Sequence, residues 1–549
     1  MTSSAILSHP MKPIADLPVD ADLAQALLSS MAEYGEQLHG RRLWLACSGG
    51  RDSLALAALC VQLYRQGKLP FLPQLLHVNH GLQADSDTWA MHVAHWAAVQ
   101  QIPCRILRAQ VNGHDEQAAR LARYDVMRAQ LNQDDVLLLA HHADDQAETV
   151  LMRLIQGAGV NGLSGMQPWC IQTQGTQRMA LWRPWLTVKR ANISNYAQRL
   201  KLPYIDDPTN DAGDNVRSGL RLDIMPVLAT YNSNVIDNIA RSAQLLRDAQ
   251  LIINAQAAED LQQIEVASLQ LSSAQRVLNI DKLQALPIYR QRQLLHHWLG
   301  QDEPLPPAKQ LVDDVFMLSQ REDPDHQTAL FWQARKQSYT ICRYRQQLYR
   351  LSSEWSKWLV LPLTKQIQPL SNLVVADADS AAAQPVSVTL RSDDNFIWQV
   401  QMMPNALAEL LDSDQDGDEK FEITFAPLGR QQRVQTALAS RPQAGKKLYQ
   451  TLGVPLWLRE SLVVVSAVSV QQDKEWPLLL VSPFESWILG TSRSLTGTPD
   501  NTGVLDSAIR SNVITNNVIT NNVITNNVIT NNVITNNVIT NSLSINNAF

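Results

Sequence analysis

The sequence has few cysteines, and those it has are scattered. The five are Cys47, Cys60, Cys104, Cys170 and Cys342, and no two of them form a CxxC pair. We therefore expect neither a disulfide framework nor a thiolate metal cluster. The chain also lacks an apolar run long enough to span a membrane, and it starts without a basic segment followed by an apolar core and a cleavage site. These absences predict a cytoplasmic protein.

An excess of basic charge is missing as well. The formal net charge is −6, whereas nucleic-acid-binding domains are commonly basic. With 549 residues, 45% of them hydrophobic, the chain is long enough for two to four globular domains. Basic residues gather in two places, each of which is either a solvated face or a nucleic-acid contact. The first group is Arg335, Lys336, Arg343, Arg345 and Arg350, interleaved with Tyr339, Tyr344 and Tyr349; the second is Arg430, Arg433, Arg441, Lys446, Lys447 and Arg459.

The stretch from Leu43 to Leu59, LWLACSGGRDSLALAAL, organises the rest of the chain. A short continuous apolar run ends at Ser48, two glycines follow, and from Leu54 the larger apolar residues recur at helical spacing. This pattern predicts a buried strand, a glycine turn and a helix. Such a helix start presents unpaired N–H groups and a positive dipole end, which together favour phosphate binding. The loop is neither a Walker A motif nor GxGxxG.

Strands and helices alternate from Arg41 onward. Apolar strands are expected at 43–47, at a segment ending in 75–80, at 104–111 and at 136–140, and a helix is expected at 115–131. Alternation of this kind is typical of a doubly wound parallel α/β sheet, in which ligands bind at the carboxyl ends of the strands. The motifs SGGRDS, HVNH and HHADD all follow predicted strands, so we expect them at one edge of the sheet.

HHADDQAET is the second informative motif. Its carboxylates Asp144, Asp145 and Glu148 lie close together at a predicted helix start, and Asp144 and Glu148 are four residues apart on one face. Clustered carboxylates attract a cation, so Mg²⁺ on ATP phosphates or a substrate ammonium is the natural occupant. The alternatives are that Asp144 is an N-cap beside a core histidine, or that His141 and His142 bind zinc.

Several motifs occur in an order that resembles the tRNA(Ile)-lysidine synthetase family. SGGRDS looks like the SGGxDS loop of the PP-loop ATP pyrophosphatase superfamily. HVNHGLQ, DEQAARLARY, HHADDQAET and GLSGM follow it, as in that family, and the likeness continues to Leu228. RQRQLLHHWL resembles the family's helical middle region, and AGKKLYQTLGVPLWLR resembles its small C-terminal domain. The resemblance covers most of residues 41–460.

The resemblance implies a ligase that uses ATP and Mg²⁺. In this family the wobble cytidine of a tRNA(Ile) with anticodon CAU attacks ATP through its C2 oxygen, giving an adenylated tRNA and pyrophosphate. The ε-amine of free L-lysine then displaces AMP to form lysidine, which changes codon specificity from AUG to AUA. The family is often dimeric, so a homodimer is possible.

The resemblance also assigns roles by residue. The loop residues Ser48, Gly49, Gly50, Arg51, Asp52 and Ser53 would bind the nucleotide. Asp52 would provide a carboxylate for Mg²⁺, with Asp145 as a second candidate ligand. Asp144, Asp145 and Glu148 would hold Mg²⁺ or the lysine ammonium, and one of them would take a proton from the amine. Arg120 and Arg123 would stabilise charge developing on the phosphates.

The sequence departs from the family pattern in places. Arg217-Ser218 stands where the family has Arg-Asn, and Arg430-Gln431-Gln432-Arg433 stands in place of RxGGxR. These departures concern the expected tRNA contacts. Two other functions stay open: a sulfur-inserting PP-loop enzyme, which would need cysteines near the loop, and a tRNA-binding relative with an inactive ATP site.

The motifs and composition divide the chain into six segments. Residues 376–385 read as a linker. The run from Asp412 to Glu422 begins like an EF-hand loop, but Ile423 at the twelfth position cannot bind Ca²⁺, so we read an acidic surface loop. The tail repeats the pentad NVITN, and because five is odd, a long strand of it has no single apolar face. We expect a disordered, β-prone tail that catalysis does not need. The segments are 1–38, an N-terminal extension; 39–232, the ATP-binding catalytic domain; 233–355, a helical tRNA-contacting domain; 356–420, linker and acidic loop; 421–500, a small α+β tRNA-binding domain; and 501–549, the repeat tail.

Overall fold

The computed structural model describes eleven stretches of the chain in two units. The units are Met1–Gln256 and Ala257–Phe549, called here the N-terminal unit and the C-terminal unit. The predicted linker and nearly all of the predicted acidic loop lie outside the described residues. No helix in the described stretches is long and apolar enough to span a membrane. These stretches are 11–81, 85–111, 116–174, 177–205, 216–322, 328–369, 386–402, 421–436, 438–471, 474–489 and 514–520.

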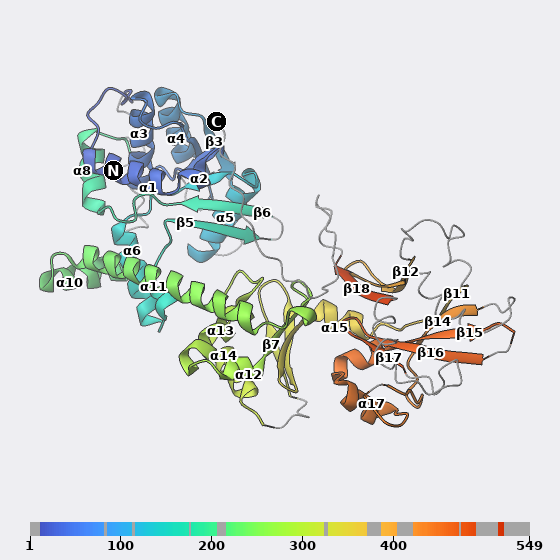
Figure 1. The fold of residues 1–549 in the computed structure, drawn as a ribbon. Coiled ribbons are helices and arrows are strands. Elements are labelled where there is room, and N and C mark those ends of the chain that lie inside the picture. The colour runs from blue at the N-terminus through green and yellow to red at the C-terminus, as the bar shows by residue number, and fades with distance from the viewer. Residues whose placement is uncertain are drawn as a thin grey trace, which may run out of the picture. The chain divides into compact units, whose positions relative to one another are not determined.

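A six-stranded sheet lies at the centre of the N-terminal unit (Figure 1). Its strand order is β3-β2-β1-β4-β6-β5. The first five strands are parallel, and β5 pairs antiparallel with β6 at one edge. This confirms the predicted doubly wound parallel sheet, to which the antiparallel edge strand is an addition. The strands are β1 Leu43–Ala46, β2 Gln74–Asn79, β3 Cys104–Arg108, β4 Val136–Leu138, β5 Trp169–Gln174 and β6 Gln177–Trp182.

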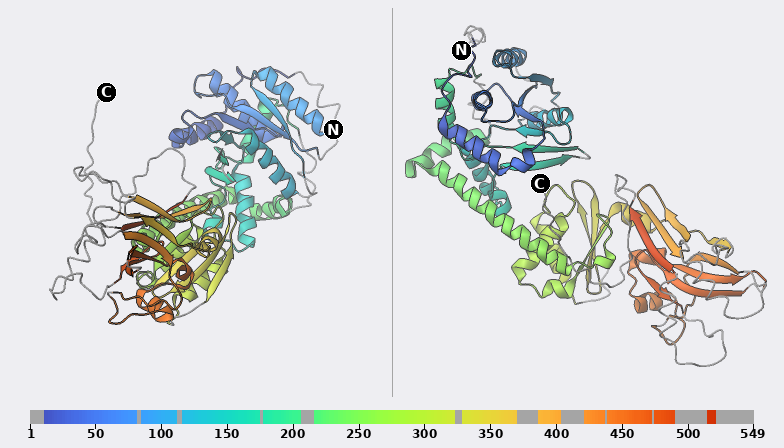
Figure 2. Two further views of the ribbon diagram at one scale, coloured as in Figure 1. Left: turned by 90° about the vertical axis from the view of Figure 1, so that its right-hand side faces the viewer. Right: turned by 45° about the horizontal axis from the view of Figure 1, so that its top comes forward.

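Helices cover both faces of this sheet, as the two views in Figure 2 show. Leucines and alanines of α1, α3 and α8 pack in one apolar core with β1 and β4. A second core on the other face includes Met127 of α5. The helices that begin in this unit, not all of which touch the sheet, are α1 Ala21–Glu33, α2 Gly35–Leu38, α3 Arg51–Arg65, α4 Ser86–Gln100, α5 Glu116–Gln130, α6 Ala143–Ile155, α7 Val160–Leu163, α8 Arg190–Arg199, α9 Val216–Gly219, the π-helix η3 Leu220–Ile224, α10 Met225–Tyr231 and α11 Val235–Ile264.

The segment that the sequence suggested as an N-terminal extension contributes to the core of the N-terminal unit. Leu23 and Leu27 of α1 are fully buried. The side-chain amide of Gln62 in α3 donates to the backbone oxygens of Ile14 at 3.1 Å and Leu17 at 2.9 Å. Residues from Ile14 onward are therefore held by both apolar burial and hydrogen bonds to the ATP-loop helix.

The C-terminal unit begins with an antiparallel sheet of order β7-β10-β9-β8 that packs against helices α12, α13 and α14. The sequence predicted the helices of this region but not its sheet. Two further antiparallel sheets follow, with orders β11-β14-β15-β16-β17 and β12-β13-β18. The elements are β7 Gln275–Asn279, α12 Ile280–Gln284, α13 Ile288–Gly300, α14 Lys309–Ser319, β8 Ala329–Gln333, β9 Ser338–Tyr344, β10 Gln347–Ser352, α15 Ser353–Leu359, β11 Gln366–Pro369, β12 Val386–Ser392, β13 Phe396–Met402, β14 Phe421–Pro427, α17 Gly445–Leu452, β15 Val463–Ser469, β16 Lys474–Val481, β17 Ser486–Ile488 and β18 Ile514–Thr520, with short 3₁₀ turns at Ala267–Leu269 and Leu456–Ser461.

Part of the first basic group is structural, since Arg343 and Arg350 are buried. It lies on and around the hairpin β9–β10, where alternation along a strand directs every second residue inward. Arg350 is fully buried and donates to the backbone oxygens of Leu299 at 2.7 Å and Gln301 at 2.8 Å, so it caps the end of α13. Tyr339 is also fully buried. A nucleic-acid contact through Arg350 and Tyr339 is therefore wrong, because both side chains belong to the core.

The repeat tail contains a strand, which corrects part of the sequence-based expectation. Residues Ile514–Thr520 form β18, which pairs antiparallel with β13 over seven residues. The expectation of a disordered tail rested on the absence of one apolar face over many repeats. A strand of seven residues needs only backbone pairing with a neighbour, and β13 supplies that partner.

Candidate active site

The SGGRDS loop joins β1 to α3 with the backbone geometry that its glycines require. Gly49 has φ +87°, and a Cβ on it would lie 3.0 Å from Val93 Cγ2 and 3.1 Å from Ile205 Cδ1. Gly50 is the N-cap of α3 and donates its N–H to Ser48 Oγ at 3.2 Å. Only glycine fits at position 49, and the turn places the N-terminus of α3 at the carboxyl edge of the sheet.

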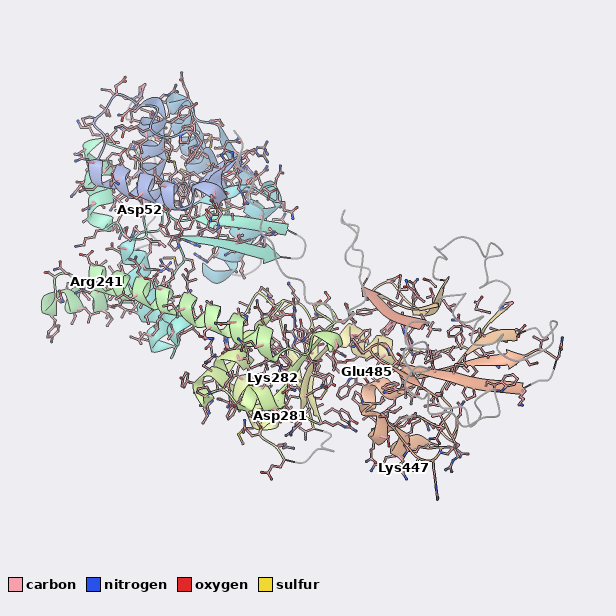
Figure 3. All side chains as sticks on the ribbon, viewed as in Figure 1. Asp52, Arg241, Asp281, Lys282, Lys447 and Glu485 are labelled. Carbon is pink, nitrogen blue, oxygen red and sulfur yellow. The ribbon has the colours of Figure 1, made fainter. Side chains whose placement is uncertain are left out.

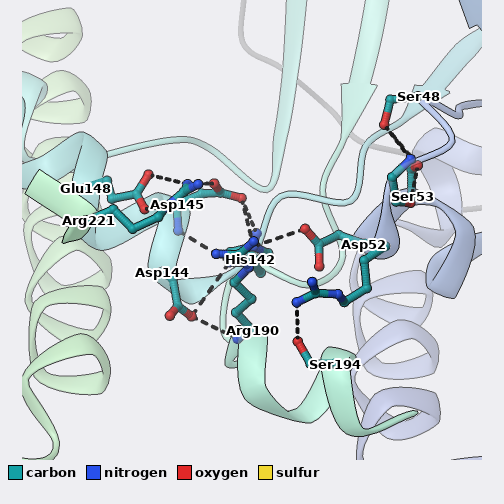
Figure 4. A network of polar contacts seen from close by, with 12 residues as sticks. Ser48, Asp52, Ser53, His142, Asp144, Asp145, Glu148, Arg190, Ser194 and Arg221 are labelled. Atoms are coloured by element: carbon teal, nitrogen blue, oxygen red, sulfur yellow. Dashed lines mark hydrogen bonds and ion pairs between the residues drawn. The ribbon is translucent and has the colours of Figure 1, made fainter. Parts of the chain in front are cut away.

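His142 occupies the centre of the carboxylate cluster (Figure 4). Its side chain is 3% exposed, and Nε2 lies 3.6 Å from Asp52 Oδ2 and 3.4 Å from Asp145 Oδ2. Its Nδ1 lies 3.7 Å from Asp144 Oδ2. Burial would lower the pKa of His142, but Asp52 and the two neighbouring aspartates raise it above its ordinary value. The His142 ring thus lies among three carboxylates from two separate motifs.

His142, not Asp144, is the N-cap of α6. Its Nδ1 accepts the N–H of Asp145 at 3.4 Å, and Asp145 Oδ2 accepts the N–H of His142 at 3.1 Å, which completes a capping box. Burial would raise the pKa of Asp145, but His142 and neighbouring cationic groups hold it below its ordinary value. The alternative that Asp144 is the N-cap is therefore wrong, because His142 occupies that position.

The four acidic side chains of the site have different partners. Asp144 Oδ2 accepts the backbone N–H of Arg190 at 2.8 Å, at the start of α8. Asp145 Oδ1 lies 3.8 Å from Arg221, which is beyond hydrogen-bond distance. Within the described residues, Asp52 Oδ1 is buried and accepts no hydrogen bond. Asp52 therefore retains an oxygen for a cation, whereas Asp145 Oδ1 faces Arg221 and one oxygen of Asp144 is used to position α8.

Glu148 is neutralised by two arginines that the sequence analysis left without a role at this site. Its side chain is 2% exposed, and its oxygens lie 2.7 and 3.0 Å from Arg221 and 3.1 Å from Arg217 Nε. Arg217 lies in α9, and Arg221 lies in the π-helix that follows it, four residues further along the chain. Glu148 is thus a buried anion with two guanidinium partners. No sequence pattern indicated this pairing, since the partners are about seventy residues apart.

A second basic layer lies beside the HHADD motif. Arg183 is buried and donates from Nε to His141 Nδ1 at 3.3 Å. Burial lowers the pKa of His141 to about 3, and the charges of Arg183 and Arg120 contribute to the lowering. His141 is therefore neutral, and zinc binding by the His141–His142 pair is not supported, because the two rings have separate partners. The charge of Arg120 reaches His141 as well, and its role at the phosphates stays a prediction.

Mg²⁺ fits the acidic groups present. The described residues contain no cluster of three His, Cys, Asp or Glu side chains arranged as a complete metal site. Mg²⁺ at nucleotide sites commonly uses only one or two carboxylates and completes its shell with phosphates and water. The buried, unsatisfied Oδ1 of Asp52, next to the phosphate loop, provides one such carboxylate.

The cysteines near the loop are unsuited to sulfur transfer. Cys47 and Cys60 are buried, and burial raises the pKa of the Cys47 thiol to about 11 and that of Cys60 to about 12. Both side chains are therefore protonated thiols at neutral pH, whereas the thiolate is the reactive form.

Loop, sheet and acidic edge define a PP-loop ATP-binding domain. The PP-loop domain family (ATP_bind_3) matches residues 22–228, and the TilS substrate binding domain matches residues 278–349. A tRNA(Ile)-lysidine synthase of Psychrobacter sp. (strain PRwf-1) is 40% identical over 505 residues, which cover 85% of this chain and 94% of that protein. The chain belongs to the tRNA(Ile)-lysidine synthase family.

Other relatives carry the same name. The tRNA(Ile)-lysidine synthase of Serratia proteamaculans (strain 568) is 31% identical over 79% of this chain and 91% of its own length. The protein of the same name from Pseudomonas aeruginosa is 40% identical over 53% of this chain and 64% of its own length. A solved structure, the U34-tRNA thiolase NcsA of Methanococcus maripaludis, aligns with 41% of this chain and 79% of that chain at 18% identity, with a TM-score of 0.33.

Proposed function

We propose that this chain ligates lysine to the wobble cytidine of tRNA(Ile) with anticodon CAU and cleaves ATP to AMP and pyrophosphate. The observation that supports this most strongly is the combination of the PP-loop with an acidic edge in which Asp52 Oδ1 is left unsatisfied among the described residues. Family membership supports the tRNA and the ligase chemistry.

The loop residues bind the nucleotide in this proposal. The N–H groups at the start of α3 and the hydroxyls of Ser48 and Ser53, whose oxygens lie 3.2 Å apart, donate to the pyrophosphate portion of ATP. Asp52 and Asp145 hold Mg²⁺, which when bound offsets the charge of the phosphates. Arg120 adds positive charge from α5 as the phosphate bond breaks.

Lysine binds beside the same carboxylates. Its ε-amine must lose a proton before it attacks the adenylated base, so a carboxylate must first hold the ammonium and then accept that proton. Asp144 is the carboxylate left for this role, since Asp52 and Asp145 hold Mg²⁺ and Glu148 is paired with Arg217 and Arg221. Glu148 is a positioning residue in this scheme: its two ion pairs orient Arg217 and Arg221 at the site.

The second basic group, at and around α17, binds the tRNA. Lys446 and Lys447 are exposed at the start of α17, where Figure 3 shows Lys447, and Arg430 has 93% of its side chain exposed. Arg459 lies over the Tyr449 ring at 4.9 Å. Exposed cations beside a helix N-terminus are suited to phosphate contacts, which give affinity without sequence readout.

The test is incubation of the full chain with ATP, Mg²⁺, labelled lysine and tRNA carrying a CAU anticodon. We expect labelled lysidine after nucleoside analysis and AMP in equal amount. Asp52→Ala should abolish pyrophosphate release while tRNA binding stays nearly intact. Asp22→Ala, an exposed carboxylate of α1, is the matched control and should retain full turnover.

Three outcomes would contradict the proposal in different ways. Pyrophosphate release with tRNA but without lysine incorporation would keep the adenylation site and require another nucleophile. Binding of tRNA without any ATP turnover would identify an inactive relative. Full turnover by Asp52→Ala would show that the phosphate loop is assigned wrongly.

A further inference from the structure

The repeat tail is the one sequence motif that the proposed function leaves unused. Its described part is β18, which adds to the edge of β13 in the three-stranded sheet β12-β13-β18. The pairing joins Met402 to Ile514 at one end and Phe396 to Thr520 at the other. β13 thus has a full strand partner that comes from a region more than a hundred residues later in the chain.

β13 is a strand whose edge needs protection. Its Trp398 and Val400 are fully buried, and they alternate with the half-buried Ile397 and Gln399. On its other side it pairs with β12. Without β18, about every second residue of β13 would expose an unpaired N–H and C=O beside buried apolar side chains, which is the usual template for unwanted strand addition.

The seven-residue sequence of β18, ITNNVIT, is not unique in the chain. Because the repeat has a period of five, shifting the pairing by five residues places the same residue type opposite every position of β13. Five is an odd number, so the shift reverses the face on which each numbered residue of the tail would lie. The residue types that pair with each position of β13 nevertheless stay the same. ITNNVIT occurs at 514–520, 519–525, 524–530, 529–535 and 534–540.

We propose that the edge of β13 is a strand-binding site for ITNNVIT, which any of the five copies in the tail can fill. The connection from Leu489 to the paired copy grows from about 25 residues for the first copy to about 45 for the last. The entropy of closing these loops therefore makes the first copy only about 2.5-fold more probable in the site than the last. From Ser511 to Phe549 the chain has no charged side chain, so no copy carries a charge that would disfavour pairing as a strand. The repeat thus contains five equivalent copies of the strand that pairs with the edge of β13.

The test uses proline, which removes a backbone donor from a strand. Val518→Pro alters only the first copy, and we expect hydrogen exchange at the amides of Phe396–Met402 to rise less than about twofold. Prolines in all five copies should raise that exchange more than about tenfold, and free ITNNVIT peptide should restore the protection. The matched control replaces the same valines by isoleucine, which keeps the N–H groups and the β-branched side chains. The five positions are Val518, Val523, Val528, Val533 and Val538.

A disulfide test in the full chain does not depend on the proline variants folding. Gln399 pairs with Asn517 in the structure, and a shift of one repeat brings Asn522 to the same place. Gln399→Cys with Asn517→Cys and Gln399→Cys with Asn522→Cys should both form intramolecular disulfides under mild oxidation. Disulfide formation by the first pair alone would overturn the proposal, and so would a loss of protection in Val518→Pro as large as that caused by five prolines.

Discussion

Replacing Glu148 by glutamine distinguishes a positioning carboxylate from a free ligand. The glutamine would keep the shape of the side chain but leave Arg217 and Arg221 without their anion. Removing one partner of a buried ion pair costs about 3–5 kcal/mol of unfolding free energy. The two arginine side chains are 28% and 24% exposed, so water screens part of that loss. We expect a loss of about 2–3 kcal/mol.

The assay is hydrogen exchange of the α6 amides, Ala143–Ile155, in the full chain. A loss of about 2–3 kcal/mol corresponds to exchange that is about 30- to 150-fold faster. Asp144→Asn is the matched control, since an asparagine oxygen still accepts the Arg190 N–H, and it should change exchange only slightly. A double change, Glu148→Gln with Arg221→Gln, should recover part of the loss because one unpaired cation is removed.

A stable Glu148→Gln variant would refute this reasoning. If exchange in α6 stayed within about threefold of the parent while lysine affinity fell sharply, Glu148 would contact the substrate directly instead of orienting the arginines. The ion pairs seen here would then describe only the unliganded state.

Two further perturbations change titratable or charged side chains, one in each unit. The fold holds His141 neutral, with a pKa of about 3 instead of its ordinary 6.5. As the pH falls, this histidine therefore binds a proton in the unfolded chain before it does so in the folded one. The folded state loses stability for this reason between pH 6.5 and 3. The glutamine of His141→Gln can still accept a hydrogen bond from Arg183 but does not titrate. Between about pH 7 and pH 5 the unfolding free energy of this variant, measured by denaturant titration, should therefore fall by up to about 2 kcal/mol less than that of the parent. An equal fall in both proteins would mean that other groups cause it. Lys446→Glu with Lys447→Glu should weaken tRNA binding and lower the slope of log affinity against log salt by up to about 2, with ATP affinity unchanged. Lys474→Glu in β16 is the control, and an unaltered slope in the double variant would place the tRNA contact elsewhere.

The local patterns of the sequence were enough to predict the fold of the catalytic region and the position of its loop. Strand, glycine turn and helix around Ser48–Ser53 follow from hydrophobic period and glycine geometry, which are properties of neighbouring residues. Parallel connectivity then places SGGRDS and HHADD at the same sheet edge. Both predictions are confirmed by β1, β4 and the helices after them.

The division of work among the acidic residues depended on tertiary structure. Sequence offered Asp144, Asp145 and Glu148 as equivalent candidates, because each is an acid at one helix start. The fold brings Arg217 and Arg221 to Glu148 and the start of α8 to Asp144, and it leaves Asp52 with an oxygen that no described residue satisfies. These pairings join residues from about forty to about seventy positions apart, and no local period encodes them.

The same limit applies to the tail and to the first basic group. The sequence by itself determined that NVITN repeats and that basic residues alternate with tyrosines. Only the tertiary structure decided that one repeat segment pairs with β13 and that Arg350 caps α13 inside the core. A strand or a buried cation is stable only when the fold supplies partners for its hydrogen bonds, and those partners come from distant parts of the chain.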